Sequence, residues 1–168
     1  MKAHGDVTAL NYSFYDIVTA DEKTSLKPLR DLKHRCLNPG MYAQHLEHWL
    51  SFFPPQQMMI IDGEELKIQP AQVMAKLQLF LKLEPVIDYR QKLRFDTRKG
   101  FFCPVTAMNT THCLGRGKGR DYPPMEASAE KYLREFFTPH NVALSKLLTK
   151  LRTSIPGWLE DELTRPES

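Results

Sequence analysis

The segment 100–123, GFFCPVTAMNTTHCLGRGKGRDYP, brings together an aromatic pair, two cysteines and a basic run spaced by glycines. Pro104, the polar residues 109–111 and four glycines argue against a regular helix or a central strand, so a loop is expected. If Cys103 and Cys113 are bonded, they close a small ring that stabilises the fold by about 2–3 kcal/mol. A loop held in one shape in this way is expected to have a function.

The run GRGKGR at 115–120 has the composition of an anion site. Its glycines let the backbone come close to a ligand and leave N–H groups uncovered, while lysine supplies a point charge and arginine a bidentate fork. Between positions 92 and 120 there are seven Lys or Arg residues and a single acid, Asp96. The run therefore predicts binding of phosphate or sulfate; the alternative is an exposed loop with scattered charge.

Four other polar residues are weaker candidates for chemistry. His45 and His48 lie close together on one predicted helix, but no further ligands accompany them at metal-binding spacing, so no metal site is expected. Glu64 and Glu65 follow a predicted strand, where adjacent side chains point to opposite faces and cannot form a shared dyad. Both glutamates are therefore expected to be structural.

The composition narrows the class of protein. The chain has 168 residues, 42% of them hydrophobic and 26% charged, which is typical of one globular domain. A net charge of +3 does not indicate a nucleic-acid partner. No apolar run is long enough for a membrane span, and the polar start MKAHGD is not a signal peptide. A Cys103–Cys113 disulfide would leave Cys36 free and would need an oxidising compartment. Because the chain shows no signal that would direct it there, we expect its N-terminus to be incomplete.

The elements that position the 100–123 segment can be predicted from hydrophobic spacing. Helices are expected over 6–20, 29–36, 42–53, 70–81, 132–137 and 144–151, with the last two separated at Pro139 and Asn141. The apolar run 58–61, MMII, predicts a strand buried on both faces of a parallel sheet. Trp158 and Leu159 are expected to close the core. Helix, buried strand and helix indicate an α/β protein whose other strands come from sequence outside this chain.

The residues also resemble a known family. The resemblance rests on five motifs: Gly40-x-Tyr42-x3-Leu46-x2-Trp49-Leu50, the run MMIIDGEEL, Lys99-Gly100-Phe101-Phe102-Cys103, Cys113-Leu114-Gly115 and Lys118-Gly119-Arg120. Together they resemble the C-terminal part of Golgi heparan sulfate sulfotransferases. AHGDVTALNYSFYDIVTA near the start, HNVALSKLL at 140–148 and IPGWLEDEL at 155–163 are similar to the sulfotransferase domain of heparan sulfate N-deacetylase/N-sulfotransferases.

This resemblance implies a set of site residues. The family uses 3′-phosphoadenosine 5′-phosphosulfate as donor, and the matching donor-binding residues here are Lys118, Gly119, Arg120, Asp121 and Tyr122. Asp121 stands where relatives carry a basic residue, and an acid facing a phosphate weakens binding unless its side chain points away.

Three further roles follow from the same resemblance. Phe102 replaces a donor-contacting tryptophan, keeping a stacking face but losing the indole N–H donor. Cys103 and Cys113 match the family's disulfide, and His4 matches a histidine of the substrate cleft.

The resemblance also implies a fold and an activity. The fold is a partial P-loop-type sulfotransferase fold, α/β with a parallel sheet flanked by helices, of which residues 1–168 form a C-terminal portion. The N-terminal half that binds the phosphosulfate, with the catalytic lysine and the proposed glutamate base, cannot be placed here. No catalytic residue is therefore assigned, and the isolated chain is expected to be inactive.

The implied reaction transfers a sulfuryl group from the donor to the glucosamine amine of N-deacetylated heparan sulfate. The partners are this glycan and the nucleotide donor, without a metal. The location is the Golgi lumen, through a membrane anchor outside this chain. Two alternatives remain: a heparan sulfate 3-O-sulfotransferase, and a non-catalytic module that binds polyanions. A glycosylation sequon, Asn109-Thr110-Thr111, lies between the two cysteines.

Overall fold

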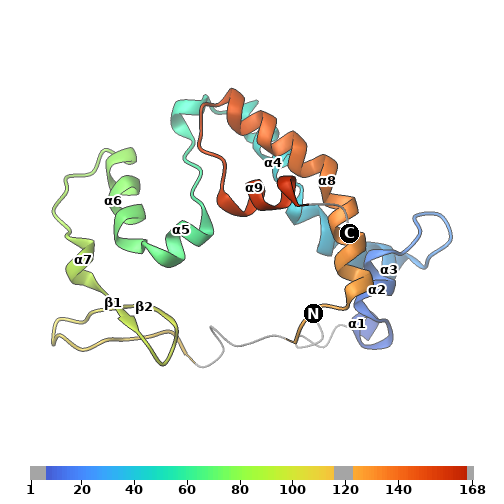
Figure 1. The fold of residues 1–168 in the computed structure, drawn as a ribbon, viewed down its shortest axis with the longest axis horizontal. Helices are drawn as coiled ribbons and strands as arrows, with labels where there is room; N and C mark the ends of the chain where they lie inside the picture. The colour runs from blue at the N-terminus through green and yellow to red at the C-terminus, as the bar shows by residue number, and fades with distance from the viewer. Residues whose placement is uncertain (1–6, 116–122, 166–168) are drawn as a thin grey trace. The chain divides into compact units, whose positions relative to one another are not determined.

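The computed structural model describes residues 7–115 and 123–165. These residues form two compact units, drawn in Figure 1. The helical unit comprises residues 7–54 and 124–165, and the hairpin unit comprises residues 55–115 with residue 123. Each unit has its own elements and is described by itself.

The helical unit is built from amphipathic helices that bury one face each. Its elements are α1 (Val7–Asn11), α2 (Phe14–Val18), α3 (Lys27–Leu37), the 3₁₀ turn η2 (Asn38–Gly40), α4 (Tyr42–Leu50), α8 (Ala127–Lys150) and α9 (Gly157–Thr164). A buried hydrophobic cluster forms where α1, α2 and α3 pack together, and it consists of Ala9, Ile17, Ala20, Leu29 and Leu32. Helix α8 packs against α2, α4 and α9 (Figure 1). The expected helices over 29–36 and 42–53 are confirmed.

The single helix expected over 6–20 is divided into α1 and α2. Ser13 begins α2 with a capping box, in which its hydroxyl accepts from the Asp16 backbone N–H (3.0 Å) while Asp16 Oδ2 accepts from the Ser13 backbone N–H (3.0 Å). A serine that satisfies free N–H groups at a helix start favours a new helix over continuation. Ile17 and Val18 are still buried, as the hydrophobic spacing predicted.

The break expected at Pro139 is wrong, because α8 runs through it from Ala127 to Lys150. Proline in a helix interior removes one backbone hydrogen bond and costs about 3 kcal/mol. Pro139 is exposed, while Leu144, Leu147 and Leu148 further along α8 are buried. Burial of these leucines offsets the cost of the proline. Leu159 on α9 is fully buried and closes this core, as expected.

The hairpin unit combines short helices with one small sheet. Its elements are η3 (Pro55–Gln57), α5 (Gly63–Ile68), α6 (Pro70–Phe80), α7 (Tyr89–Lys92), β1 (Leu93–Asp96) and β2 (Phe101–Pro104). Strands β1 and β2 pair antiparallel, with Leu93 opposite Pro104 and Asp96 opposite Phe101. The helix expected from Pro70 is confirmed, and Val73 on it is buried.

The strand expected over 58–61 is absent from the structure, and the described residues contain no parallel sheet. An isolated run of apolar residues cannot satisfy the hydrogen bonds of a central strand without neighbours. Glu64 and Glu65 therefore lie on helix α5 and not on a strand end; Asp62 caps that helix by accepting from the Glu64 backbone N–H at 2.9 Å. The broad class, a mixture of helix and strand, is as expected.

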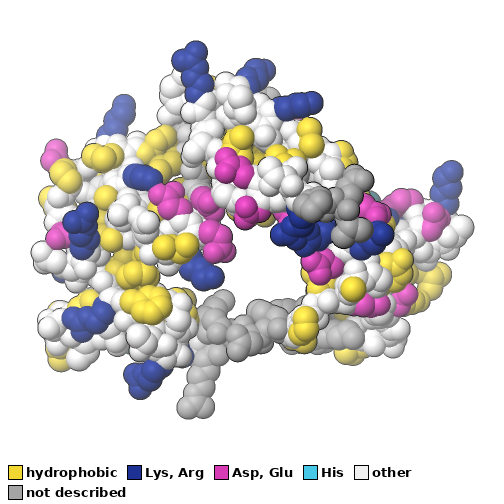
Figure 2. Space-filling view, viewed as in Figure 1, with side chains coloured by type: hydrophobic (Ala, Val, Ile, Leu, Met, Phe, Trp, Pro, Cys, Tyr) yellow, Lys and Arg dark blue, Asp and Glu magenta, His cyan; other side chains and the backbone are white. Residues whose placement is uncertain are grey.

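Several large hydrophobic side chains reach the surface of both units (Figure 2). On α4 and the turn after it, Trp49 and Phe52 are 56% and 69% exposed. Exposed aromatic groups of this kind are typical of surfaces that contact further protein or a ligand. Among the helices that the structure describes, none combines the length and the apolar character required to cross a bilayer.

Candidate functional site

The turn between β1 and β2 is organised by Asp96. Its Oδ1 accepts hydrogen bonds from the backbone N–H groups of Arg98 (2.9 Å) and Lys99 (3.1 Å), and its backbone carbonyl accepts from Gly100 N–H (2.8 Å). Gly100 has a φ of 72°, a left-handed conformation that glycine adopts without strain. An aspartate that caps its own turn, followed by a glycine, makes a defined hairpin from the sequence DTRKG.

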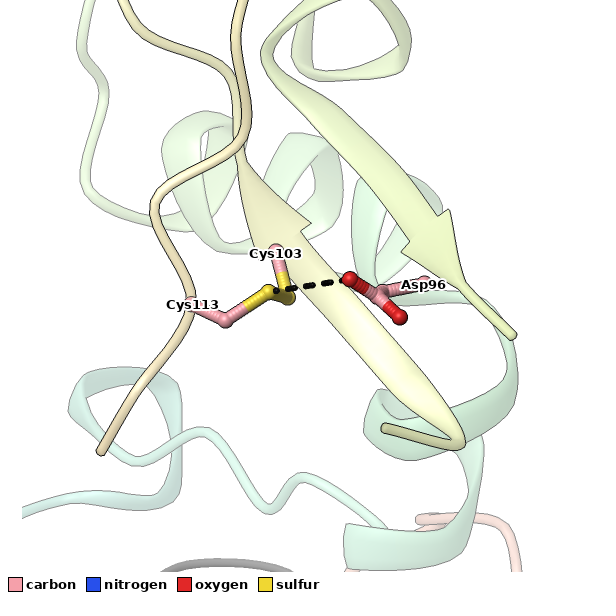
Figure 3. Close-up of side chains that lie close together, drawn as sticks. All are labelled: Asp96, Cys103 and Cys113. Carbon is pink, nitrogen blue, oxygen red and sulfur yellow. Dashed lines mark hydrogen bonds between the residues drawn. A yellow bond between two sulfur atoms is a disulfide. The ribbon is translucent and has the colours of Figure 1, made fainter. Parts of the chain in front are cut away.

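A disulfide joins β2 to the chain that returns alongside it. Cys103 is fully buried and is bonded to Cys113, with their Cα atoms 4.9 Å apart. The expected pairing is therefore confirmed. Asp96 points at this bond (Figure 3), and its Oδ2 lies 3.5 Å from Cys113 Sγ. A disulfide sulfur carries no proton, so only after reduction could this contact become a true hydrogen bond.

The three side chains in Figure 3 have donor atoms within 4.8 Å of one another, the spacing of a metal site. Zinc and similar ions are bound by cysteine thiolates. The sulfurs of Cys103 and Cys113 are bonded to each other, so neither is a thiolate. The cluster is therefore a structural junction, in which the carboxylate of Asp96 and the disulfide hold the same hairpin together.

The ring between the two cysteines is a hydrogen-bonded turn. Thr106 N–H donates to the Thr110 carbonyl at 2.7 Å, and Asn109 N–H donates to the Thr106 carbonyl at 3.0 Å. Val105 also forms a bridge with Thr111. The expectation of a loop throughout 100–123 is thus wrong for residues 101–104, which form β2, because proline at the end of an edge strand is tolerated.

Arg94 on β1 stabilises this turn through two hydrogen bonds. Its Nη2 donates to Asn109 Oδ1 at 2.7 Å, and its Nη1 donates to the Asn109 backbone carbonyl at 3.3 Å. The guanidinium of Arg94 is therefore a structural group and not a free anion ligand. Sequence reasoning missed this pair because its members are 15 positions apart.

Phe102 lies at the centre of β2 with its side chain half-buried. Its ring packs edge-on against Phe95 of β1, with ring centres 5.3 Å apart. This contact fixes the orientation of Phe102 and keeps part of its surface available for stacking. The geometry therefore permits Phe102 to stack against a ligand. Its side chain cannot donate a hydrogen bond, because phenylalanine has no polar hydrogen.

The remaining predicted site residues lie outside the described residues. These are His4, Lys118, Gly119, Arg120, Asp121 and Tyr122. The described chain reaches Leu114 and Gly115, the two residues that follow Cys113, and both are exposed. The disulfide thus anchors the sequence that leads directly into the predicted anion-binding run.

The weaker candidates have structural partners. His45 Nε2 lies 2.8 Å from the Asn38 carbonyl, and the ring of His48 packs edge-on against Phe52. Glu64 pairs with Lys67 at 3.7 Å, and Glu65 pairs with Lys76. The structural role expected for the two glutamates agrees with their ion pairs.

The helical unit has a pocket of about 330 Å³ with aromatic walls. Tyr42 and Trp158 meet there edge-on, with ring centres 6.1 Å apart. Arg134, which also lines the pocket, pairs with Glu130 at 2.6 Å and with Glu162 at 3.6 Å. One guanidinium paired with two carboxylates leaves these three groups with a net negative charge, so the pocket does not favour an anion.

Comparison with known proteins defines the class. The family model described as "Sulfotransferase domain" matches residues 6–147. The chain therefore belongs to the sulfotransferase-domain family.

Individual relatives show which sulfotransferases the chain is similar to. The chain is 51% identical to the bifunctional heparan sulfate N-deacetylase/N-sulfotransferase of Drosophila melanogaster over 97% of its length. It is 47% identical over 96% of its length to the human protein numbered 2 with the same description, and 45% identical over 98% to the human protein numbered 3. The chain spans only 16%, 18% and 19% of these three relatives. The expected similarity to these enzymes is confirmed.

Proposed function

We propose that this chain is part of an N-sulfotransferase that moves a sulfuryl group from 3′-phosphoadenosine 5′-phosphosulfate to the glucosamine amine of N-deacetylated heparan sulfate. The observation that carries the proposal is 51% identity, over 97% of this chain, to a protein described as a heparan sulfate N-deacetylase/N-sulfotransferase. The disulfide-closed hairpin that leads into the run GRGKGR supports it, because such a run suits a phosphate or sulfate.

The reaction is an in-line displacement at sulfur. The lone pair of the glucosamine nitrogen attacks the sulfur, the bond from sulfur to the 5′-phosphate oxygen breaks, and a base takes the amine proton. Stabilising the charge on the leaving phosphate is the main electrostatic requirement. Lys118 and Arg120 supply positive charge to the nucleotide phosphates, and Phe102 stacks on the donor.

Other parts of the proposed site have less direct support. Gly119 lets the backbone approach the donor, and Tyr122 completes the contact. A carboxylate facing the phosphates would weaken binding, so Asp121 supplies no favourable charge to the donor. His4 contributes to glycan binding, as the family resemblance implies. No metal is required for this displacement.

We also propose a P-loop-type fold for the complete enzyme. The half-buried run 58–61 becomes a strand of a parallel sheet once neighbouring strands are present. The location is the Golgi lumen, which fits the Cys103–Cys113 disulfide, since such bonds persist in oxidising compartments.

Sulfate transfer by the natural enzyme tests the proposal. Radiolabelled donor is incubated with N-deacetylated heparosan and with an acceptor whose amines remain acetylated. We expect label on the free amine only. The double variant Lys118→Ala, Arg120→Ala should lose donor affinity, while Lys146→Ala, at an exposed position on α8, is the control for loss of a surface cation elsewhere. Transfer to the acetylated acceptor at a hydroxyl would overturn the N-sulfotransferase assignment.

A further inference from the structure

We propose that the side-chain amide of Asn109 carries an N-linked oligosaccharide. Asn109-Thr110-Thr111 has the acceptor pattern of asparagine, any residue except proline, and threonine. This inference rests on the proposed function, because the modification requires a lumenal protein.

The structure presents Asn109 in the manner that such a modification requires. Asn109 is exposed and has a φ of 58°, so it lies in the left-handed region at the turn of the disulfide ring. Asparagine tolerates this conformation better than most residues. A bulky group on its side chain therefore extends into solvent and need not disturb a core.

Arg94 fixes which side-chain atom of Asn109 remains available. The carbonyl oxygen Oδ1 accepts from Arg94 Nη2 at 2.7 Å. Among the described residues, no hydrogen bond uses Nδ2, the atom to which a sugar is attached. The bond from Arg94 is therefore compatible with modification and holds the asparagine in one orientation.

The two threonines of the sequon have different roles. The Thr110 hydroxyl lies 2.7 Å from the Thr106 hydroxyl and closes the turn. The Thr111 hydroxyl, which occupies the position that the acceptor pattern requires, takes part in no hydrogen bond within the described residues. Variants at these adjacent positions can thus separate recognition of the sequon from stability of the turn.

The chemical step balances without an oxidant or a reductant. Nδ2 of Asn109 attacks the anomeric carbon of an oligosaccharide linked to a lipid diphosphate. The carbon–oxygen bond to the diphosphate breaks, the lipid diphosphate leaves with the electron pair, and the amide loses one proton to a base of the transferring enzyme. The product is a glycosylated amide.

Site-resolved mass spectrometry tests the proposal on the natural protein, tagged at its own gene and purified from cells. Release of glycans by an amidase in water enriched in the heavy oxygen isotope converts a modified asparagine into an aspartate that carries one labelled oxygen. Resolution by site is needed because Asn11-Tyr12-Ser13 is a second sequon. We expect label at Asn109 in the wild type and in Thr110→Ala, and loss of label in Thr111→Ala.

An unlabelled Asn109 in the wild type overturns the proposal, as does equal labelling in Thr110→Ala and Thr111→Ala. Protease protection in sealed vesicles and sulfate transfer are measured on the same material. A protected, active enzyme with a bare Asn109 overturns only the glycosylation. A protein that is digested in sealed vesicles overturns the lumenal location and the glycosylation together.

Discussion

Asp96 contacts both structures that shape the hairpin, the turn at 96–100 and the disulfide. Its carboxylate lies 3.5 Å from Cys113 Sγ. Reduction of the bond requires one sulfur to leave as a thiolate, and a thiolate beside a carboxylate is disfavoured by like charge. Asp96 is therefore expected to protect the disulfide in addition to capping the turn.

Asp96→Asn tests this protection, since asparagine keeps a carbonyl oxygen to cap the turn. Removing the charge takes away the like-charge repulsion on the leaving thiolate, so dithiothreitol should reduce the disulfide about threefold faster in this variant. Alkylation of the released thiols measures the rate. Asp88→Asn, at the start of α7, is the control. An unchanged or slower rate in Asp96→Asn would contradict the protective role.

Asp16 provides a second prediction for a single residue. Its pKa is lowered from 3.8, chiefly because the Ser13 hydroxyl donates to its carboxylate and also because the Ser13 backbone N–H does so. A carboxyl with a depressed folded-state pKa contributes stability above its unfolded pKa, and this contribution is lost as the pH falls through the folded pKa. Ser13→Ala should therefore raise the pKa of Asp16, as measured by NMR titration. A pKa that does not move would show that the capping box is not the cause.

At the scale of elements, close packing places a glycine at position 40. A Cβ atom built on Gly40 would lie 2.7 Å from the ring of Phe137, and that ring is held by Phe136 and His140. Gly40→Ala should thus lower the free energy of unfolding by about 1–3 kcal/mol. Gly157→Ala is the matched control, because a Cβ there meets no atom within 4 Å. Chemical denaturation measures both, and an equal effect of the two variants would contradict the packing argument.

In helix α8 a substitution is expected to stabilise the fold instead of destabilising it. Pro139 is exposed and breaks the hydrogen-bond pattern of a helix that otherwise runs from Ala127 to Lys150. Pro139→Ala should raise the free energy of unfolding by about 1–3 kcal/mol, since alanine restores one backbone donor. Thermal unfolding followed by circular dichroism checks this, and a lower melting temperature would contradict it.

Hydrophobic spacing predicted helices reliably where one face is buried by neighbours close in sequence. Helix α3, which packs against α1 and α2, and helix α6, which packs against α5 and α7, are of this kind. The same reasoning failed at residues 12–13, where a serine cap begins a new helix and the first helix does not continue. It also failed at Pro139, where burial of leucines elsewhere on α8 offsets the free-energy cost of a proline inside the helix. A strand at 58–61 depends on partners that local sequence does not contain, so its periodicity alone could not decide the structure.

The candidate site was predictable to the extent that its residues carry the family pattern. The pairing of Cys103 with Cys113 came from resemblance and is confirmed. The bracing of Asn109 by Arg94 and the contact of Asp96 with the disulfide join residues 15 and 17 positions apart, a relation that no local pattern encodes. The roles of His4 and of residues 118–122 stay predictions.

At the scale of the whole molecule, these 168 residues contain a described sheet of only two strands, and they span less than a fifth of the relatives they match. Charge stabilisation of the leaving phosphate and a base for the amine are both required for transfer. We therefore expect the isolated chain to transfer no radiolabelled sulfate to N-deacetylated heparosan. Turnover by the purified chain would contradict this and would place all catalytic groups within it.

The most direct test of the central claim is calorimetric titration of the oxidised natural protein with 3′-phosphoadenosine 5′-phosphate. The comparison set is the wild type, the double variant Lys118→Ala, Arg120→Ala, and the control Lys146→Ala. We expect saturable binding by the wild type and the control, and loss of binding in the double variant. Unchanged binding in the double variant, or equal binding of an unrelated polyanion that displaces the nucleotide, would contradict the claim that this loop recognises the sulfate donor.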